Sequence, residues 1–137
     1  SNLVDLSISD CSITTINTLT TINDYAFQGC SNLTWESLPP NLQIIGESSF
    51  ESCTKLNIKS FPKSIQTIRK GAFYSCTELT EIIIQNEIAR IHDEAFGKCQ
   101  KLQKAYLGTK IDFHRNAFIE TNGEIIITDD SPECFQI

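Results

Sequence analysis

Methionine is absent from the 137 residues of this sequence, and proline, glycine and long hydrophobic runs are scarce. Because even residue 1 is not methionine, we expect a processed or excised product. No apolar stretch approaches the roughly 18 residues needed to cross a bilayer, so no membrane insertion by this segment is expected. The glycines form no phosphate-binding loop, and no serine or cysteine has a histidine and carboxylate suitably placed across the repeats. We therefore predict no catalytic residue.

Positive charge is also scarce. The sequence has 11 lysines and arginines against 17 aspartates and glutamates, a formal net charge of −6. Proteins bind nucleic-acid backbones through clustered lysine and arginine, and no such cluster occurs here, so no nucleic-acid partner is expected. No linker, low-complexity run or charge block divides the chain, which predicts a single domain over residues 1–137.

A 23-residue repeat fills the centre of the sequence. Phenylalanines recur at that spacing, each followed three residues later by cysteine: Phe27/Cys30, Phe50/Cys53, Phe73/Cys76 and Phe96/Cys99. The copies align from Leu19, Leu42, Ile65, Ile88 and, one residue early, Ile111. Seven columns stay apolar or small, and in the first copy they are Leu19, Ile22, Ala26, Phe27, Cys30, Leu33 and Leu38. A fixed period in the range of roughly 20–50 residues predicts a solenoid whose copies bury their apolar faces on one another.

Each copy contains signals for two elements. The i, i+1, i+4 spacing of Ala26, Phe27 and Cys30 places three side chains on one face of a helical turn. The near-alternating, β-branched segment 79–84 predicts a short strand. Stacked strands would lie about 4.8 Å apart in a parallel sheet. We therefore predict an α/β fold: a short right-handed solenoid with a parallel β-sheet on one wall and short helical or 3₁₀ turns on the other.

The pattern Leu-x-x-Ile-x-x-x-Ala-Phe-x-x-Cys-x-x-Leu resembles the BspA-like leucine-rich repeat over about residues 19–123. The resemblance implies a non-enzymatic protein-recognition or adhesion module, secreted or on the cell surface, that presents its sheet wall to a protein or glycan ligand. The alternative is a structural subunit that self-associates into a larger extracellular or filamentous assembly through its solenoid ends and strand edges.

The ends of the chain depart from the repeat. Residues 3–8 repeat the strand pattern but lie 30 residues before Leu33, which makes 13–18 an insertion. At the other end Thr121 replaces the cysteine, and 124–128 predicts a final strand. We expect an N-terminal cap at 1–18, four repeats at 19–110, and a degenerate repeat with a C-terminal cap at 111–137.

The first two predicted strands carry Glu36 and Lys59 where the family has an apolar residue. These charges could form an inward ion pair. Alternatively, the strand is bulged, Trp35 and Ile58 turn inward, and both charges are exposed. The bulge is favoured because burying an ion pair costs desolvation that a small stack recovers poorly.

Six cysteines invite a disulfide framework. In a stacked column, parallel Cα–Cβ vectors hold neighbouring Cβ atoms about 4.8 Å apart, beyond the usual disulfide range of about 3.5–4.5 Å. We therefore predict that the four column cysteines are buried, reduced thiols. Cys11 and Cys134 lie in opposite caps, and each is either free or paired locally. No two cysteines have zinc-ligand spacing.

A metal site could be drawn from His92 and His114 with Asp93 or Glu94. The same column holds asparagine, glycine and arginine in other copies, which favours a solvated turn, so no metal and no cofactor are predicted.

The remaining candidate site is the sheet wall. Residues expected to face a ligand are Ser37, Ser60, Ile83 and Tyr106, and, if the strands are unbulged, Trp35, Ile58, Glu81 and Lys104. Ile83 and Tyr106 are predicted to stack, either as an interface patch or as ordinary cross-strand packing. Asn32, in the triplet Asn32-Leu33-Thr34, is a candidate N-glycosylation site that is predicted to be exposed.

Overall fold

A computed structural model describes residues 18–86 and 89–130. Several predictions lie outside these ranges: the strand pattern at 3–8, the insertion that begins at residue 13, and the states of Cys11 and Cys134.

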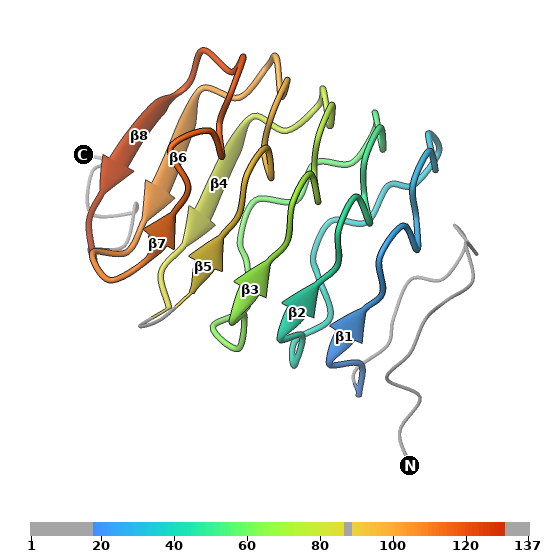
Figure 1. Ribbon diagram of the computed structural model, residues 1–137, viewed down its shortest axis with the longest axis horizontal. Coiled ribbons are helices and arrows are strands. Elements are labelled where there is room, and N and C mark those ends of the chain that lie inside the picture. The colour runs from blue at the N-terminus through green and yellow to red at the C-terminus, as the bar shows by residue number, and fades with distance from the viewer. Residues whose placement is uncertain (1–17, 87–88, 131–137) are drawn as a thin grey trace.

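The chain forms a parallel-strand solenoid of about five turns (Figure 1). One sheet has the order β1-β2-β3-β5-β7, and its strands are β1 (Thr21–Ile22), β2 (Ile44–Ile45), β3 (Thr67–Ile68), β5 (Arg90–Ile91) and β7 (Asp112–Phe113). The other has the order β4-β6-β8, with β4 (Glu81–Ile84), β6 (Lys104–Leu107) and β8 (Glu124–Ile127). All pairings are parallel.

The register of the first sheet follows the repeat. Thr21 pairs with Ile44, Ile44 with Thr67 and Thr67 with Arg90, each 23 residues on. Arg90 then pairs with Asp112, 22 residues on, at the copy that was predicted to begin one residue early. The period is therefore also the spacing of the coils.

The phenylalanine column is the centre of the core. Phe27, Phe50, Phe73 and Phe96 are fully buried. Their rings stack with centroids 5.4, 5.1 and 5.2 Å apart and interplanar angles between 1° and 12°. Near-parallel aromatic rings at this distance gain stacking energy beyond their burial. Each copy therefore buries its aromatic ring against the rings of its neighbours.

The wall opposite the second sheet is not helical, contrary to the prediction. No helix occurs in residues 18–86 and 89–130. Instead, alternate amides point in different directions: the Ala26 N–H donates within its own coil to Asn23 O (3.2 Å), whereas the Tyr25 and Phe27 N–H groups donate to carbonyls of the next coil (both 2.8 Å). A helix would use every amide within itself. We call this surface the turn wall, residues 23–30 and their equivalents in later coils.

The backbone dihedrals explain how the turn wall alternates. Two positions per coil adopt positive φ, two residues before and two residues after the core phenylalanine. They are Tyr25, Ser48, Gly71 and Glu94 before it, and Gly29, Ser52, Ser75, Lys98 and Glu120 after it. Such residues interrupt a right-handed helix. Side-chain spacing alone could not separate a helical turn from this arrangement, because both place the same three side chains inward.

The sheet wall forms strands only from the third coil onward. In the described part of the first two coils, the only strand-like pairing on this wall is a bridge between Ser60 and Ile83. Trp35 and Ile58 turn inward, with 7% and 0% exposure, whereas Glu36 and Lys59 are exposed. This confirms the favoured alternative, an inward turn of Trp35 and Ile58 in place of a buried ion pair.

Aromatic packing accounts for the inward turn of Trp35. Its indole meets the Phe27 and Phe50 rings edge-on, at centroid distances of 5.2 and 5.9 Å. Such edge-to-face contacts are favourable, and a solvent-facing tryptophan would lose them.

The first sheet was not predicted. Its strands are two residues long, which is too short for an alternating pattern to be recognised. The sequence marked only the inward residue of each strand, such as Ile22 and Ile45, as a core column.

Candidate recognition surface

The outer surface of strands β4, β6 and β8, which we call the sheet face, is the candidate site. Ile82, Ile84, Ala105 and Leu107 point inward, with at most 1% exposure. Alternation along a strand sends the residues between them outward. The outward residues form two cross-strand rows: Glu81, Lys104 and Glu124, and Ile83, Tyr106 and Ile126.

The charged row alternates in sign. Lys104 is exposed and lies between Glu81 and Glu124 on the neighbouring strands. Within the described ranges, none of these three side chains forms an ion pair. All three charges are therefore available to a partner of complementary pattern.

The apolar row is more closed than was predicted. Ile83 and Tyr106 are directly paired across the strands, so the predicted stacking is confirmed. However, Tyr106 is only 6% exposed, and Ile83 and Ile126 are half-buried. Because Tyr106 has a strand on each side, its ring is enclosed by cross-strand packing. The prediction that it forms an open aromatic contact is therefore wrong.

The other predicted site residues separate into two groups. Trp35 and Ile58 are in the core, so their assignment to a ligand-facing surface is wrong, because the chain turns them inward to fill the first two coils. Ser37 and Ser60 are exposed, and Ser60 joins the sheet face through its bridge to Ile83. The prediction omitted Glu124 and Ile126, although the alternation of the final predicted strand could have identified both.

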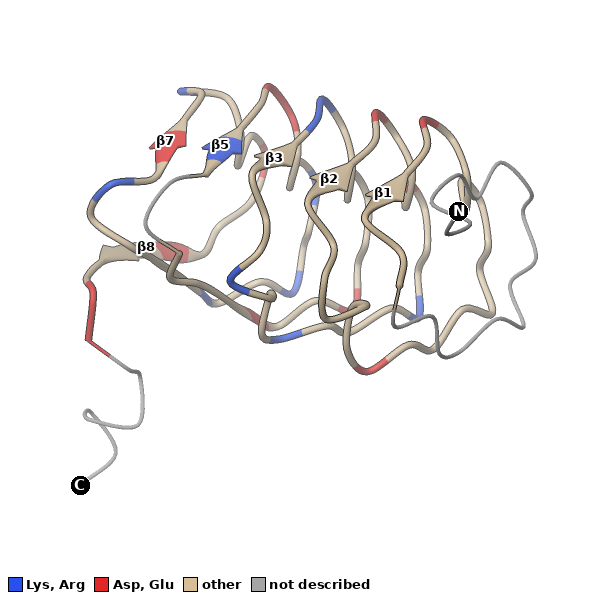
Figure 2. Cartoon of the chain, turned by 90° about the horizontal axis from the view of Figure 1, so that it is seen from below, with Lys and Arg blue, Asp and Glu red and all other residues tan. Residues whose placement is uncertain are grey.

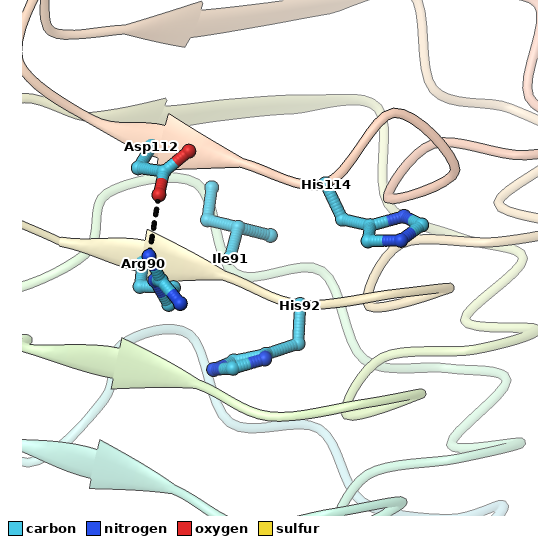
Figure 3. Close-up of a pocket in the computed structure, with 5 residues that line it drawn as sticks. All are labelled: Arg90, Ile91, His92, Asp112 and His114. Atoms are coloured by element: carbon cyan, nitrogen blue, oxygen red, sulfur yellow. Dashed lines mark hydrogen bonds and ion pairs between the residues drawn. The ribbon is translucent and has the colours of Figure 1, made fainter.

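A small hollow of about 140 Å³ lies on the first sheet and is lined by Arg90, Ile91, His92, Asp112 and His114 (Figure 3). Arg90 and Asp112 form an ion pair of 2.8 Å across β5 and β7, whereas β1, β2 and β3 carry no charged residue (Figure 2). The two imidazoles point apart (Figure 3), and His114 Nδ1 accepts the Asn116 N–H at 3.0 Å. Across residues 18–86 and 89–130, no three metal-binding side chains come together.

A larger hollow, of about 590 Å³, lies at the corner between the two sheets and is lined mainly by polar side chains, including Gln43, Ser64, Gln66, Gln85 and Asn86. Asn86 is buried, and its amide nitrogen donates to Ile65 O. The amide oxygen of Asn86 has no partner.

The cysteine column is a ladder of hydrogen bonds. The Cys53, Cys76 and Cys99 thiols donate to the carbonyl of the phenylalanine in the preceding coil, at 3.1, 3.0 and 3.3 Å. Thr121 Oγ1 makes the same bond to Phe96 O at 2.9 Å, which explains a threonine at the end of the column. Burial raises the pKa of the Cys53 and Cys99 thiols to about 12 and that of Cys76 well above its ordinary value. These thiols are not nucleophiles at neutral pH.

Cys30 corrects the prediction of four free thiols. Cys53, Cys76 and Cys99 are free, but Cys30 is disulfide-bonded, to a cysteine outside the described residues. The geometric argument considered only neighbours within the column, which cannot pair. It did not exclude a partner from outside the column at the first coil.

Parallel coils at a 23-residue spacing, with inward columns of leucine, isoleucine and phenylalanine, define a leucine-rich-repeat solenoid. The chain belongs to the BspA type leucine rich repeat region family, whose model matches residues 5–124 as six copies. The match begins inside the segment that was predicted as the N-terminal cap. No curated protein and no solved structure matches the chain.

Family membership indicates the kind of protein. This repeat family is generally non-enzymatic and suggests a protein-interaction or adhesion module. Its members are typically surface or secreted proteins. Nowhere in the described residues is there a helix with the length and apolarity to cross a membrane.

Proposed function

We propose that this chain is a non-enzymatic recognition module that presents its sheet face to a protein ligand. The observation that carries the proposal is the unpaired row of Glu81, Lys104 and Glu124 on a rigid three-stranded sheet. A partner surface with charges in the order positive, negative, positive would match this row. Half-buried Ile83 and Ile126 would add apolar contact beside it.

We place the module outside the cell or on its surface. Disulfides persist in oxidising compartments and are rare in the cytosol. The disulfide at Cys30 therefore supports the compartment that is typical of the family.

Site-specific photo-crosslinking tests the sheet face. A photoreactive residue at position 104 should capture surface proteins of intact cells, whereas one at position 55, an exposed lysine outside the sheet face, should not. For a captured protein, Lys104→Glu should weaken binding at least tenfold, whereas Lys55→Glu should change it less than twofold. Equal capture from both positions, or equal effects of the two substitutions, would contradict the proposal.

A glycan ligand is a finer version of this proposal, and the larger hollow favours it. Amide and hydroxyl groups of Gln43, Ser64 and Gln66 can exchange hydrogen bonds with sugar hydroxyls. Binding to an oligosaccharide array, with Gln66→Ala as the loss variant and Lys55→Glu as the control, tests it. Loss of array binding in both variants or in neither would count against this site.

A second candidate function is assembly through the solenoid end, in which a second copy covers the last coil. Ile125 and Ile127 of β8 continue the inward rows of Ala105 and Leu107 but are 38% and 50% exposed. β8 is also the outermost strand of its sheet (Figure 1). An uncovered strand edge with apolar side chains is a template for pairing.

Backbone amides favour the same surface. The Phe96 and Lys98 N–H groups donate to carbonyls of the last coil at 2.8 and 2.9 Å. The equivalent N–H groups of Phe118 and Glu120 have no hydrogen-bond partner within the described residues. A further coil, supplied by a second copy, would accept them.

Charge sets the condition under which copies would associate. Glu120, Glu124 and Asp129 make this end acidic, so two copies repel each other at low salt. Sedimentation should show association that increases from 20 to 500 mM salt (roughly 20 to 4 Å of screening length) and is abolished by Ile127→Lys. A monomer at all salt concentrations would exclude this second function.

A further inference from the structure

The triplet Asn32-Leu33-Thr34 lies on an exposed turn of the first coil. The Leu33 N–H donates to Cys30 O at 3.1 Å and closes a β-turn whose central residues are Ser31 and Asn32. Asn32 and Thr34 are exposed, whereas Leu33 between them is fully buried. The buried leucine therefore fixes the turn and leaves the asparagine amide in solvent.

The surroundings of Asn32 leave room for a large group. No hydrogen bond or ion pair to the rest of the described chain involves its side chain. The equivalent positions of the next coils hold the long, charged side chains of Lys55, Glu78 and Lys101. Lys101 and Glu78 form an exposed ion pair of 2.6 Å, so this edge of the solenoid is a solvated row. A group attached at Asn32 would displace no packed residue.

The disulfide at Cys30 gives a second, independent indication. Cys30 begins the same β-turn, two residues before Asn32. Disulfide formation needs an oxidising compartment, and the eukaryotic secretory pathway supplies one together with N-glycosylation. The thiols of Cys53, Cys76 and Cys99 are fully buried, so they can pass through that compartment unpaired.

We propose that Asn32 carries an N-linked oligosaccharide when the chain is secreted by a eukaryotic cell. The oligosaccharide would cover the side of the first coil. Strand β4 belongs to the third coil, about 10 Å further along the stack at roughly 4.8 Å per coil, so the sheet face stays open. The modification does not depend on the proposed recognition function.

Secretion of the full chain from a eukaryotic host, behind a cleavable signal, tests the proposal. N-glycosidase treatment should lower the mass of the wild-type protein and of Thr34→Ser, which keeps the acceptor triplet. Asn32→Gln and Thr34→Ala should show no mass loss. Asn57→Gln, an exposed asparagine outside any such triplet, is the matched control and should behave as wild type.

A secreted wild-type protein with no mass loss would overturn the proposal. Translation with eukaryotic microsomes covers the case in which a variant does not fold, because the oligosaccharide is added to the nascent chain. There the wild type should gain one oligosaccharide and Asn32→Gln none; an unshifted wild type also overturns it. A glycosylated protein with a thermal midpoint well below that of the enzymatically deglycosylated protein would show that the folded turn does not accommodate the group.

Discussion

At the residue scale, the least well satisfied position is Ser49. It stands in a core column that is alanine in the other coils, is fully buried, and its hydroxyl has no hydrogen-bond partner. An unpaired buried hydroxyl costs about 1–3 kcal/mol. Ser49→Ala should therefore raise the free energy of unfolding by about 1 kcal/mol in urea denaturation. Ser37→Ala, at an exposed site, is the control and should change it by less than about 0.5 kcal/mol. Destabilisation by Ser49→Ala would mean that the hydroxyl has a partner.

The buried thiols make stability depend on alkaline pH. The folded state holds the pKa of Cys99 at about 12, whereas the unfolded thiol ionises near its model value of 9.0. A raised folded pKa gives stability that is complete below the unfolded pKa and is lost as pH rises toward the folded value. The gap in unfolding free energy between wild type and Cys99→Ala should therefore narrow above pH 9, by about 1.4 kcal/mol per pH unit. A gap that stays constant from pH 8 to 11 would show that the thiol ionises equally in both states.

At the scale of the element, the phenylalanine stack carries the largest single contribution. Phe73 lies between Phe50 and Phe96, and Phe61 meets its ring edge-on at 5.5 Å. Phe73→Ala should lower the free energy of unfolding by about 3–5 kcal/mol in denaturant titration. A loss below about 1 kcal/mol would show that the column is not core.

The turn wall depends on its left-handed residues. Gly71 has φ of 63°, and a Cβ there would lie 3.3 Å from Ser48 Oγ. Gly71→Ala should therefore cost about 1 kcal/mol. Glu94 occupies the same place in the next coil with φ of 59°, so Glu94→Gly trades relief of strain against chain entropy and should be neutral within about 0.5 kcal/mol. Equal losses in both variants would indicate that φ does not decide the cost.

At the scale of the whole molecule, a stack is weakest at its ends. Phe118 has one stacked neighbour, Phe96 at 5.3 Å, and is only partly buried. Phe118→Ala should therefore cost roughly half as much as Phe73→Ala, and an equal cost would mean that the last coil is covered in solution. Native-state hydrogen exchange should likewise be faster in β8 than in β4.

The repeat made most of the fold predictable. Residues such as Phe50 and Ile45 recur at one period, and stacking is the way in which such short copies bury them, so the solenoid and its core followed from the pattern. The site was predictable only in part. Lys104 and Ile83 lie on the sheet face, but Trp35 was misplaced because its orientation depends on rings in its own and the next coil.

The sequence by itself determined the period, the inward columns and the family. Apolar residues at a fixed spacing have one way to leave water, which is to stack, and that requirement is visible along the chain. Only the tertiary structure decided the turn wall, the two-residue strands and the disulfide at Cys30. In each case the partner lies in another coil or another part of the chain. An amide such as that of Phe27 bonds a carbonyl 22 residues away, and no local pattern indicates whether it turns toward its own coil or the next.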